Sequence, residues 1–392
     1  MIITDLNVLV VGNPWKNWIF LELITDEGII GHGEATGGLT SSPIAAQLRE
    51  IRDLVVGQDP MNPRAVWEHL QKSLYFECGP AVSGIEIACW DVIGRKLGTP
   101  VWQLLGGALQ PRLRAYANGW YSGPRDPRGF AEAAQAVVAR GYTALKFDPF
   151  GHAYKSIDRA DLREALALVE AVRGAVGDDV DIMIEAHDRF TVGTAIQIGK
   201  ELQAFSPYWL EAPVQSTDIA GLVEVARSQP VRVAAGERFT EASSFAELLH
   251  TRAIDIVQPE ILNCGGVQGL VTAASVASAY GAWIAPHNAQ SPFTTVVNAH
   301  VGAAMPSFLI QETFDDFAEP WGREIMSGGC TVQDGYVELP NGPGFGVDFD
   351  TDAMAKYPYS PQNFLRLFRP GWETRRGDRP GASGRQAAHV SS

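Results

Sequence analysis

Short apolar segments alternate with longer amphipathic segments from residue 114 onward, and this alternation limits the folds open to the chain. Parallel sheets with crossover helices are built from such repeated β/α units. About eight units over roughly 200 residues predict an α/β fold of the (β/α)8 type, a TIM-like barrel with one unit modified. The competing arrangement is an open doubly wound sheet, but no GxGxxG follows its first strand, so nucleotide-binding versions lose support. The predicted strands are 114–118, 144–147, 181–185, 208–211, 231–235, 254–259, 283–286 and 308–311. The predicted helices are 127–139, 157–176, 192–202, 218–229, 243–251 and 267–280.

The 392 residues are long enough for further domains around this core. Residues 1–50 read as β-rich and residues 43–105 as helical, so we predict an N-terminal α+β unit over 1–112. The barrel is then predicted over 113–327. Residues 328–392 contain turns and short strands that we expect to pack back on the N-terminal unit, with a mobile tail from about residue 375.

Charge and targeting signals exclude several classes of function. The net charge of −14 argues against binding nucleic acid. The four cysteines form no CxxC pair, so neither a disulfide framework nor a zinc ribbon is indicated. No apolar run approaches the roughly 20 residues of a membrane span, and the N-terminus does not read as a signal peptide. We therefore expect a cytoplasmic protein with neither nucleic-acid nor membrane partners.

Polar residues follow the predicted strands at the length of one β/α unit. The series runs at steps of 26, 26, 23, 27 and 25 residues, through Glu185, Glu211, Glu237, Glu260, His287 and Glu312. Each should lie at the mouth of a successive barrel strand, where barrel enzymes place their chemistry. A single glutamate in such a place would be an ordinary loop acid.

Three carboxylates on neighbouring strand ends favour a metal site over three unrelated loop acids. In a pocket of low dielectric constant, Glu185, Glu211 and Glu237 would repel one another and stay ionised only around a cation. An all-oxygen ligand set with room for water and substrate oxygens suits Mg²⁺, with Mn²⁺ as the alternative.

The motifs around these residues resemble the enolase superfamily, mandelate racemase subgroup, over nearly the whole chain. The barrel motifs are Ile184-Glu185-Ala186-His187, Leu210-Glu211-Ala212-Pro213, Ala235-Gly236-Glu237-Arg238, Gln258-Pro259-Glu260, Gly265-Gly266, Ala285-Pro286-His287 and Gln311-Glu312. Motifs similar to the family's capping domain are Gly31-His32-Gly33-Glu34, Trp90-Asp91-Val92-Ile93-Gly94-Arg95 and the late Pro343-Gly344-Phe345-Gly346. The resemblance implies that the three carboxylates bind one Mg²⁺ per subunit, which a carboxylate substrate chelates. It also implies that a proton α to this carboxylate is abstracted.

The resemblance also implies roles for the remaining strand-end residues. His287 would be the base, oriented by Glu260, where the family usually has Asp. The family's Lys-x-Lys is here Lys146-Phe147-Asp148, and loss of the second Lys argues against racemisation. Lys146 would hold the substrate carboxylate or pair with a metal-ligand carboxylate, and these alternatives stay open.

Two further residues take part in the predicted chemistry. Glu185-Ala186-His187 is similar to the Asp-x-His of galactonate dehydratases, in which the histidine is the general acid for the departing 3-hydroxyl. Strand alternation would direct His187 into the barrel mouth together with Glu185. Glu312 resembles the family residue that binds substrate oxygen near the developing enolate.

Substrate contacts are predicted mainly from the cap. The loop with Trp15, Lys16, Asn17 and Trp18 is the candidate lid, together with residues 75–80. Asp148 and Arg189 are further candidates for binding the substrate, although an arginine there could equally pair with a neighbouring glutamate.

These predictions combine into an acid-sugar dehydratase, a hydro-lyase that forms a 2-keto-3-deoxy acid, and we expect it to be a homo-oligomer. Its partner would be a small sugar acid. The alternative enzyme is an isomerase, either an epimerase or a lactone cycloisomerase, which would use the same metal and His287. A non-catalytic barrel predicts a damaged ligand set, whereas all three carboxylates are present. A barrel hydrolase usually needs a histidine-rich metal site, but only His187 and His287 fall at strand ends.

Overall fold

The computed structural model describes residues 1–75 and 79–374. The predicted mobile tail and residues 76–78 of the candidate lid lie outside these ranges. In the described part of the chain, no helix combines the length and the apolar character needed to cross a lipid bilayer.

The N-terminal unit is an antiparallel three-stranded sheet covered by helices. Its strands are β1 (Ile3–Val11), β2 (Trp18–Thr25) and β3 (Ile30–Glu34), in that order. Its helices are α1 (Ser42–Glu50), α2 (Arg52–Val55), α3 (Pro63–Leu74), α4 (Gly79–Leu97) and α5 (Val101–Leu104). Glycines let α4 lie directly on β3: a Cβ on Gly31 would come 2.3 Å from the Ala88 carbonyl oxygen. The predicted α+β unit is therefore present.

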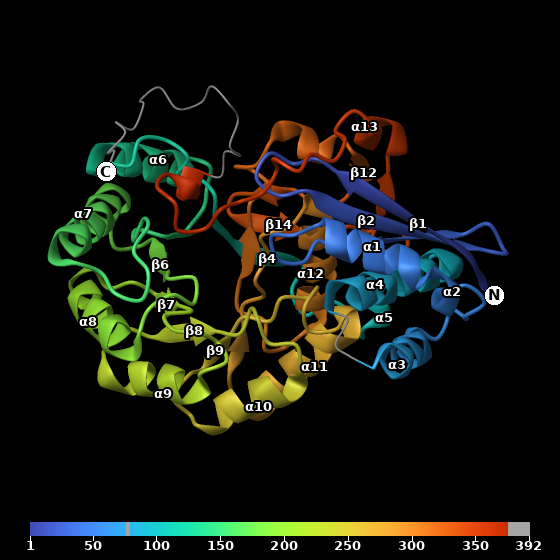
Figure 1. Cartoon of the computed structure of the whole chain (residues 1–392), viewed down its shortest axis with the longest axis horizontal. Helices are drawn as coiled ribbons and strands as arrows, with labels where there is room; N and C mark the ends of the chain where they lie inside the picture. Colours follow the sequence, from blue (N-terminus) through green and yellow to red (C-terminus); the bar gives the residue numbers. More distant parts are fainter. Residues whose placement is uncertain (76–78, 375–392) are drawn as a thin grey trace, which may run out of the picture.

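The predicted alternation of strands and helices is confirmed from residue 112 onward. The strands are β4 (Arg112–Ala117), β5 (Ala144–Phe147), β6 (Asp181–Glu185), β7 (Trp209–Glu211), β8 (Val233–Ala235), β9 (Ile256–Val257), β10 (Trp283–Ile284) and β11 (Gln311–Thr313). The intervening helices are α6 (Pro127–Ala139), α7 (Arg159–Val176), α8 (Val192–Leu202), η1 (Gln203–Phe205), α9 (Ile219–Ser228), α10 (Ala242–His250), α11 (Gly266–Ala279) and α12 (Pro292–Ala304). In Figure 1, helices α6 to α10 form an outer arc around strands β4 to β9.

The two edges of this parallel sheet are linked through the segment that contains β11. Strands β4 to β10 pair in sequence order, and β11 pairs in parallel with β4. Just before β11, Phe308 forms a parallel bridge with Ile284 of β10. The side chains enclosed by the strands form one buried cluster: Tyr116, Ala144, Met183, Trp209, Ala234, Ile256, Ala285 and Ile310.

Local sequence signals set where many of the helices begin. A side-chain oxygen accepts a hydrogen bond from a first-turn backbone N–H, which satisfies a group that the helix cannot pair itself. Proline follows the cap directly in α3, α6 and α12, where its missing N–H costs nothing. The capping residues are Asn62, Asp126, Asp158, Thr191, Asp218, Ser291 and Asp350.

The described part of the C-terminal segment contacts both the N-terminal unit and the parallel sheet. Its elements are η2 (Pro320–Arg323), β12 (Met326–Gly328), β13 (Val332–Gln333), β14 (Tyr336–Glu338), β15 (Val347–Phe349), α13 (Thr351–Ala355) and η3 (Trp372–Thr374). Strand β14 pairs antiparallel with β4, and the ring of Phe349 lies 4.3 Å from that of His32 in the cap. Figure 1 shows β12 and α13 beside β1 and β2. Beyond α13, the chain crosses to the mouth of the sheet, which the sequence did not predict.

Candidate active site

Three carboxylates converge where β6, β7 and β8 end. Glu185 and Glu211 are direct neighbours in the pairing of β6 with β7, and Glu237 follows Gly236, whose φ is +127°. One ligand oxygen from each residue lies within 4.8 Å of the others. Burial raises the pKa of Glu211 to about 8, with a further contribution from Glu185. Burial also raises the pKa values of Glu185 and Glu237. Bringing three such groups together as anions requires compensating positive charge.

Lys146 supplies part of that charge from the end of β5. Its Nζ lies 3.2 Å from Glu185 Oε2 and 3.0 Å from Glu312 Oε1, and it also donates to Glu211 Oε1. Burial would lower the pKa of Lys146, but the surrounding carboxylates raise it well above its usual value. Of the two alternatives for Lys146, the structure shows the pairing with metal-ligand candidates.

Glu260 and His287 meet across adjacent strand ends, as the sequence suggested. The two residues form a parallel β-bridge, and His287 Nδ1 lies 2.7 Å from Glu260 Oε2. Gln290 Nε2 and the backbone N–H of Leu262 also donate to this carboxylate. The longer side chain of glutamate therefore still reaches the imidazole. The other ring nitrogen of His287, Nε2, faces Glu237 and lies 3.3 Å from its Oε2.

Carboxylates around His287 decide its protonation. Burial alone would lower its pKa. The charge of Glu237, the hydrogen bond to Glu260 and the charge of Glu312 outweigh burial and raise the pKa to about 10. The imidazole thus responds directly to the charge state of the carboxylate cluster.

His187 is a second imidazole held by a carboxylate, but strand alternation does not place it there. His187 and Asp188 have φ values of +50° and +58°, so the chain has already left the extended conformation of β6. His187 Nδ1 lies 2.7 Å from Asp148 Oδ2, and its backbone N–H donates to Glu185 Oε1 at 2.7 Å. His187 does line the cavity, so its predicted location is right although the reason was wrong.

Asp148 and Arg189, predicted to bind substrate, lie behind His187 instead. Both side chains are buried and neither lines the cavity. Arg189 donates to Asp148 Oδ1 and, at 2.8 Å, to the Gly151 carbonyl oxygen. Burial would raise the pKa of Asp148, but Arg189 and His187 lower it. The ionised carboxylate between them is positioned to orient the imidazole.

Glu312 on β11 is fully buried, and several hydrogen-bond donors surround its carboxylate. It accepts from Asn118 Nδ2 at 2.7 Å and from the Asn288 backbone N–H at 2.8 Å, in addition to Lys146. Burial would raise the pKa of Glu312, but Lys146, His287 and these amides lower it to about 2. Direct contact of Glu312 with substrate remains a prediction.

The cavity in front of these groups has a volume of about 570 Å³. Trp15 and Lys16 line it, as predicted for the lid loop. Trp18 does not: as the first residue of β2 it is buried, with its ring 5.5 Å from that of Trp321. The full lining is Trp15, Lys16, Gly38, Leu39, Asn118, Lys146, Glu185, His187, Asp188, Glu237, Arg238, Thr240, Glu260, Asn263, His287, Ala289, Gln290, Leu365 and Leu367.

The sequence analysis missed the contribution of the C-terminal segment to this cavity. Leu365 and Leu367 line it, and Trp372 packs edge-on against His187 with ring centroids 5.0 Å apart. A signal was present, because the apolar residues Phe364, Leu365, Leu367 and Phe368 stand just before the Gly- and Arg-rich end. Such residues seldom remain in solvent together.

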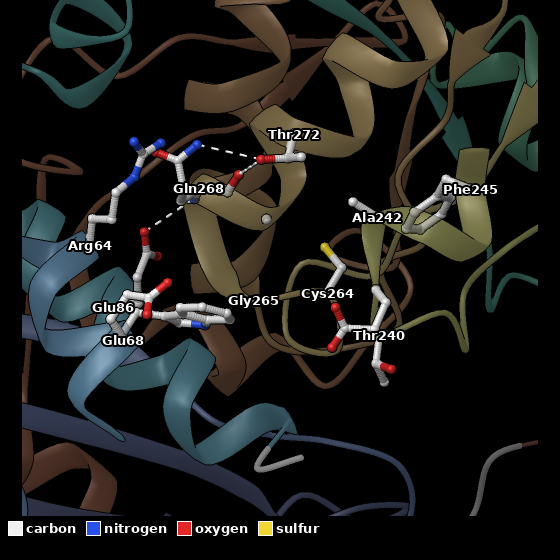
Figure 2. Close-up of a pocket in the computed structure, with 13 residues that line it drawn as sticks. Arg64, Glu68, Glu86, Thr240, Ala242, Phe245, Cys264, Gly265, Gln268 and Thr272 are labelled. Atoms are coloured by element: carbon white, nitrogen blue, oxygen red, sulfur yellow. Dashed lines mark hydrogen bonds between the residues drawn. The ribbon is translucent and has the colours of Figure 1, made fainter. Parts of the chain in front are cut away.

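A second cavity, of about 360 Å³, lies between α3, α4 and α11. Figure 2 shows its lining, with the Glu86 carboxylate of α4 reaching the first turn of α11. Glu86 accepts from the backbone N–H groups of Val267 at 2.8 Å and Gln268 at 3.1 Å. It therefore caps α11 from the N-terminal unit, and none of the three clustered carboxylates lines this cavity.

Two family models match the chain. The model described as "Enolase C-terminal domain-like" matches residues 129–353. The model described as "Mandelate racemase / muconate lactonizing enzyme, N-terminal domain" matches residues 11–106.

Similar proteins are named as dehydratases. The D-gluconate dehydratase of Thermoproteus tenax is 37% identical over 92% of this chain and 74% of its own length. The D-gluconate/D-galactonate dehydratase of Picrophilus torridus is 34% identical, covering 92% of this chain and 93% of its own. The D-xylonate dehydratase of Haloferax volcanii is 32% identical, covering 90% and 88%.

Solved structures with the same arrangement cover nearly the whole chain. The mandelate racemase/muconate lactonizing enzyme from Sulfitobacter sp. has a TM-score of 0.87 and 31% identity, covering 93% of this chain and 97% of its own. A member of the enolase superfamily from Salmonella Typhimurium has a TM-score of 0.85 and 28% identity, covering 91% and 98%.

Proposed function

The chain belongs to the mandelate racemase/muconate lactonizing enzyme family of the enolase superfamily, and on that premise we propose that it is an acid-sugar dehydratase. It is a hydro-lyase for a carboxylic acid with hydroxyls at C2 and C3. One observation carries this proposal: two histidines, each held at Nδ1 by a carboxylate, line the same cavity as the carboxylate cluster. The names of the relatives, dehydratases of gluconate, galactonate and xylonate, support this class of substrate.

We further propose that the parallel sheet is the modified (β/α)8 barrel predicted from the sequence, over residues 113–327. The pairing of β11 with β4 and the enclosed cluster of side chains support this arrangement. Residues 1–112 would be the capping domain, and residues 328–392 would complete it.

Glu185, Glu211 and Glu237 fit a divalent cation. Their oxygens lie close together, and both burial and mutual repulsion disfavour three adjacent anions without one. Hard oxygen donors suit Mg²⁺, with Mn²⁺ as the alternative. When bound, Mg²⁺ would stabilise the negative charge that develops on the substrate carboxylate as the C2 proton leaves.

His287 is the base for the C2 proton in this proposal. Glu260 holds Nδ1, which leaves Nε2 as the atom that accepts the proton, and stabilises the imidazolium that results. Glu237, a proposed metal ligand, is one of the carboxylates that raise the pKa of His287. A cation held by Glu237 would offset its negative charge and so lower the pKa of His287 toward the range in which an imidazole can act as a base.

His187 is the acid for the departing 3-hydroxyl. Asp148 holds Nδ1, which leaves Nε2 as the atom that would donate a proton to the leaving oxygen. The C2–H and C3–O bonds break, water leaves, and the enol tautomerises to a 2-keto-3-deoxy acid. Asp148 stands where a second base would be needed for racemisation, and its two carboxylate oxygens already bind Arg189 and His187.

Trp15 and Lys16 are the proposed substrate contacts from the cap. Lys16 Nζ donates to the Ala289 carbonyl oxygen at 3.0 Å and to the side chain of Gln290, both on the loop that follows His287. The lid loop is therefore joined to the loop that carries the base.

Replacing each histidine separately tests the division of labour. His287→Asn should stop both dehydration and exchange of the C2 proton with solvent deuterium. His187→Asn should lower dehydration by about 10²–10⁴-fold, while C2 exchange survives on the His287 side. Survival of exchange in His287→Asn and its loss in His187→Asn would reverse the roles. Normal dehydration in both variants would refute this site.

A further inference from the structure

The C-terminal segment contacts the proposed acid directly. The indole of Trp372 stands perpendicular to the imidazole of His187, with an interplanar angle of 87°. Trp372 Nε1 donates to the Gly151 carbonyl oxygen at 2.8 Å, and its side chain is only 5% exposed. Because the hydrogen bond fixes the indole, the ring presents a fixed wall to one side of His187.

The same segment also packs on the groups that hold His187 from behind. The rings of Phe368 and Trp372 lie 4.7 and 5.9 Å from the guanidinium of Arg189. Arg189 donates to Asp148, and Asp148 accepts from His187 Nδ1. Thus both the ring and its carboxylate partner depend on contacts with this segment.

A partly buried ion pair joins the end of the segment to the loop that follows β4. Arg125 Nε lies 2.7 Å from Glu373 Oε1, and the Glu373 side chain is 5% exposed. Arg125 also donates to the Pro149 carbonyl oxygen, next to Asp148. The anchor therefore holds the segment against the loop that begins with the carboxylate partner of His187.

Apolar residues from three parts of the chain close the mouth around this contact. Trp15 of the cap, together with Leu365 and Trp372 of the C-terminal segment, forms a buried cluster. Leu39, Ala289, Leu367 and Phe368 pack against it. Trp15, Leu365 and Leu367 line the same cavity as His187, so this cluster supplies an apolar part of the cavity wall.

We propose that Trp372 is a positioning residue for His187, and that residues 365–373 hold this imidazole in line with the leaving hydroxyl. This inference rests on the proposed function, in which His187 is the acid. Asp148 fixes one ring nitrogen but leaves the ring free to swing about that bond, and the indole blocks the swing. An acid displaced by about 1 Å can lose on the order of 10² in rate.

The test compares two leaving groups on the same variants. Hydroxide needs a proton from an acid in order to leave, whereas fluoride needs much less assistance. The substrates are whichever of D-gluconate, D-galactonate and D-xylonate the wild type dehydrates fastest, and the 3-deoxy-3-fluoro analogue of that acid. Keto-acid formation and fluoride release are measured with Mg²⁺ present.

Trp372→Ala should lower kcat for dehydration by about 10- to 100-fold and change fluoride release by less than about threefold. Trp372→Phe keeps a ring beside His187 but loses the hydrogen bond to Gly151 that fixes the ring, so it should lose dehydration selectively but less than Trp372→Ala. The matched control is Phe364→Ala, an exposed aromatic residue of the same segment that does not line the cavity, and it should match wild type on both substrates.

Equal losses on both substrates, or no loss on either, would overturn the positioning role. Circular dichroism checks folding, and if Trp372→Ala does not fold, Trp372→Phe carries the test through a smaller, selective loss of dehydration. A wild type that dehydrates none of the three acids would instead refute the proposed function.

Discussion

Two histidines line the cavity, and each is paired with a carboxylate that the chain supplies from a neighbouring strand end. Glu260 serves His287, and Asp148 serves His187. Both pairs use Nδ1, so each leaves Nε2 for the substrate. The two pairs differ in their surroundings: His287 adjoins the carboxylate cluster through Glu237, whereas His187 is packed against Trp372.

Glu237→Gln should weaken Mg²⁺ binding by more than about tenfold, because even residues that merely support a metal ligand change affinity by roughly 10–100-fold. Titration calorimetry with MgCl₂ measures the affinity. Glu241→Gln is the control, since Glu241 is an exposed acid four residues later and lies outside the carboxylate cluster. Equal Mg²⁺ affinity in wild type and Glu237→Gln would mean that the metal site is misplaced.

Single residues show which contacts of the site could be predicted from the sequence and which could not. The spacing of strand-end residues predicted the meeting of Glu260 with His287, because adjacent parallel strands bring their ends together. It could not predict that Asp148 and Arg189 pair with each other and do not line the cavity, since that contact joins side chains 41 residues apart in the sequence. The burial of Trp18 could not be predicted either, because burial in a tertiary cluster leaves no local pattern in the sequence.

At the scale of elements, the N-terminal unit contacts the helices of the parallel sheet at their N-termini. Glu86 of α4 caps α11, and Glu34 of β3 accepts from the Ser291 and Thr294 hydroxyls at the start of α12. These helices follow the loops that carry Glu260 and His287. The N-terminal unit thereby contacts the helices that follow both Glu260 and His287, which the sequence alone did not predict because the contacts span the two units.

Gly266→Ala should destabilise the fold by about 1–3 kcal/mol. Gly266 has φ of +74°, and an added Cβ would lie 2.1 Å from Glu86 Oε2. Gly174→Ala in α7 is the control. A Cβ on Gly174 would meet no atom within 4 Å, so this substitution should stabilise the fold by up to about 1 kcal/mol. Urea denaturation measures both, and a Gly266→Ala variant as stable as wild type would contradict the close packing of α4 on α11.

His300 of α12 should make the junction with the cap sensitive to acid. Its Nδ1 accepts from the Trp102 N–H at 3.1 Å, and its Nε2 lies 3.2 Å from the Phe345 carbonyl oxygen, so the neutral ring fits. Burial lowers the pKa of His300 to about 4 from its usual 6.5. Between pH 6.5 and 4, the unfolded chain binds a proton that the folded chain does not, so stability falls as pH falls, by about 3 kcal/mol in total.

His300→Asn keeps an acceptor for Trp102 but cannot take up that proton. We expect the urea midpoint of wild type to fall more than that of the variant as pH is lowered from 7 to 4.5. Parallel pH profiles for the two proteins would contradict a neutral, buried His300.

At the scale of the whole molecule, the cavity is assembled from all three parts of the chain. The cap supplies Trp15 and Lys16, the parallel strands supply the charged groups, and the C-terminal segment supplies Leu365 and Leu367. The repeated β/α pattern sufficed to predict the parallel strands and the charged residues at their ends. The walls come from segments without such periodicity, so their placement required the folded structure.

The most direct test of the account is the reaction of the wild-type protein with a panel of mono- and diacid sugars. With Mg²⁺, we predict formation of a 2-keto-3-deoxy acid from at least one of them, detected as the semicarbazone and by the loss of water in the product mass. Activity should vanish in chelator and return with added Mg²⁺. A product of unchanged mass would instead indicate an isomerase. Full activity in metal-free protein, or no product and no C2 exchange from any acid with metal bound, would contradict a metal-dependent dehydratase.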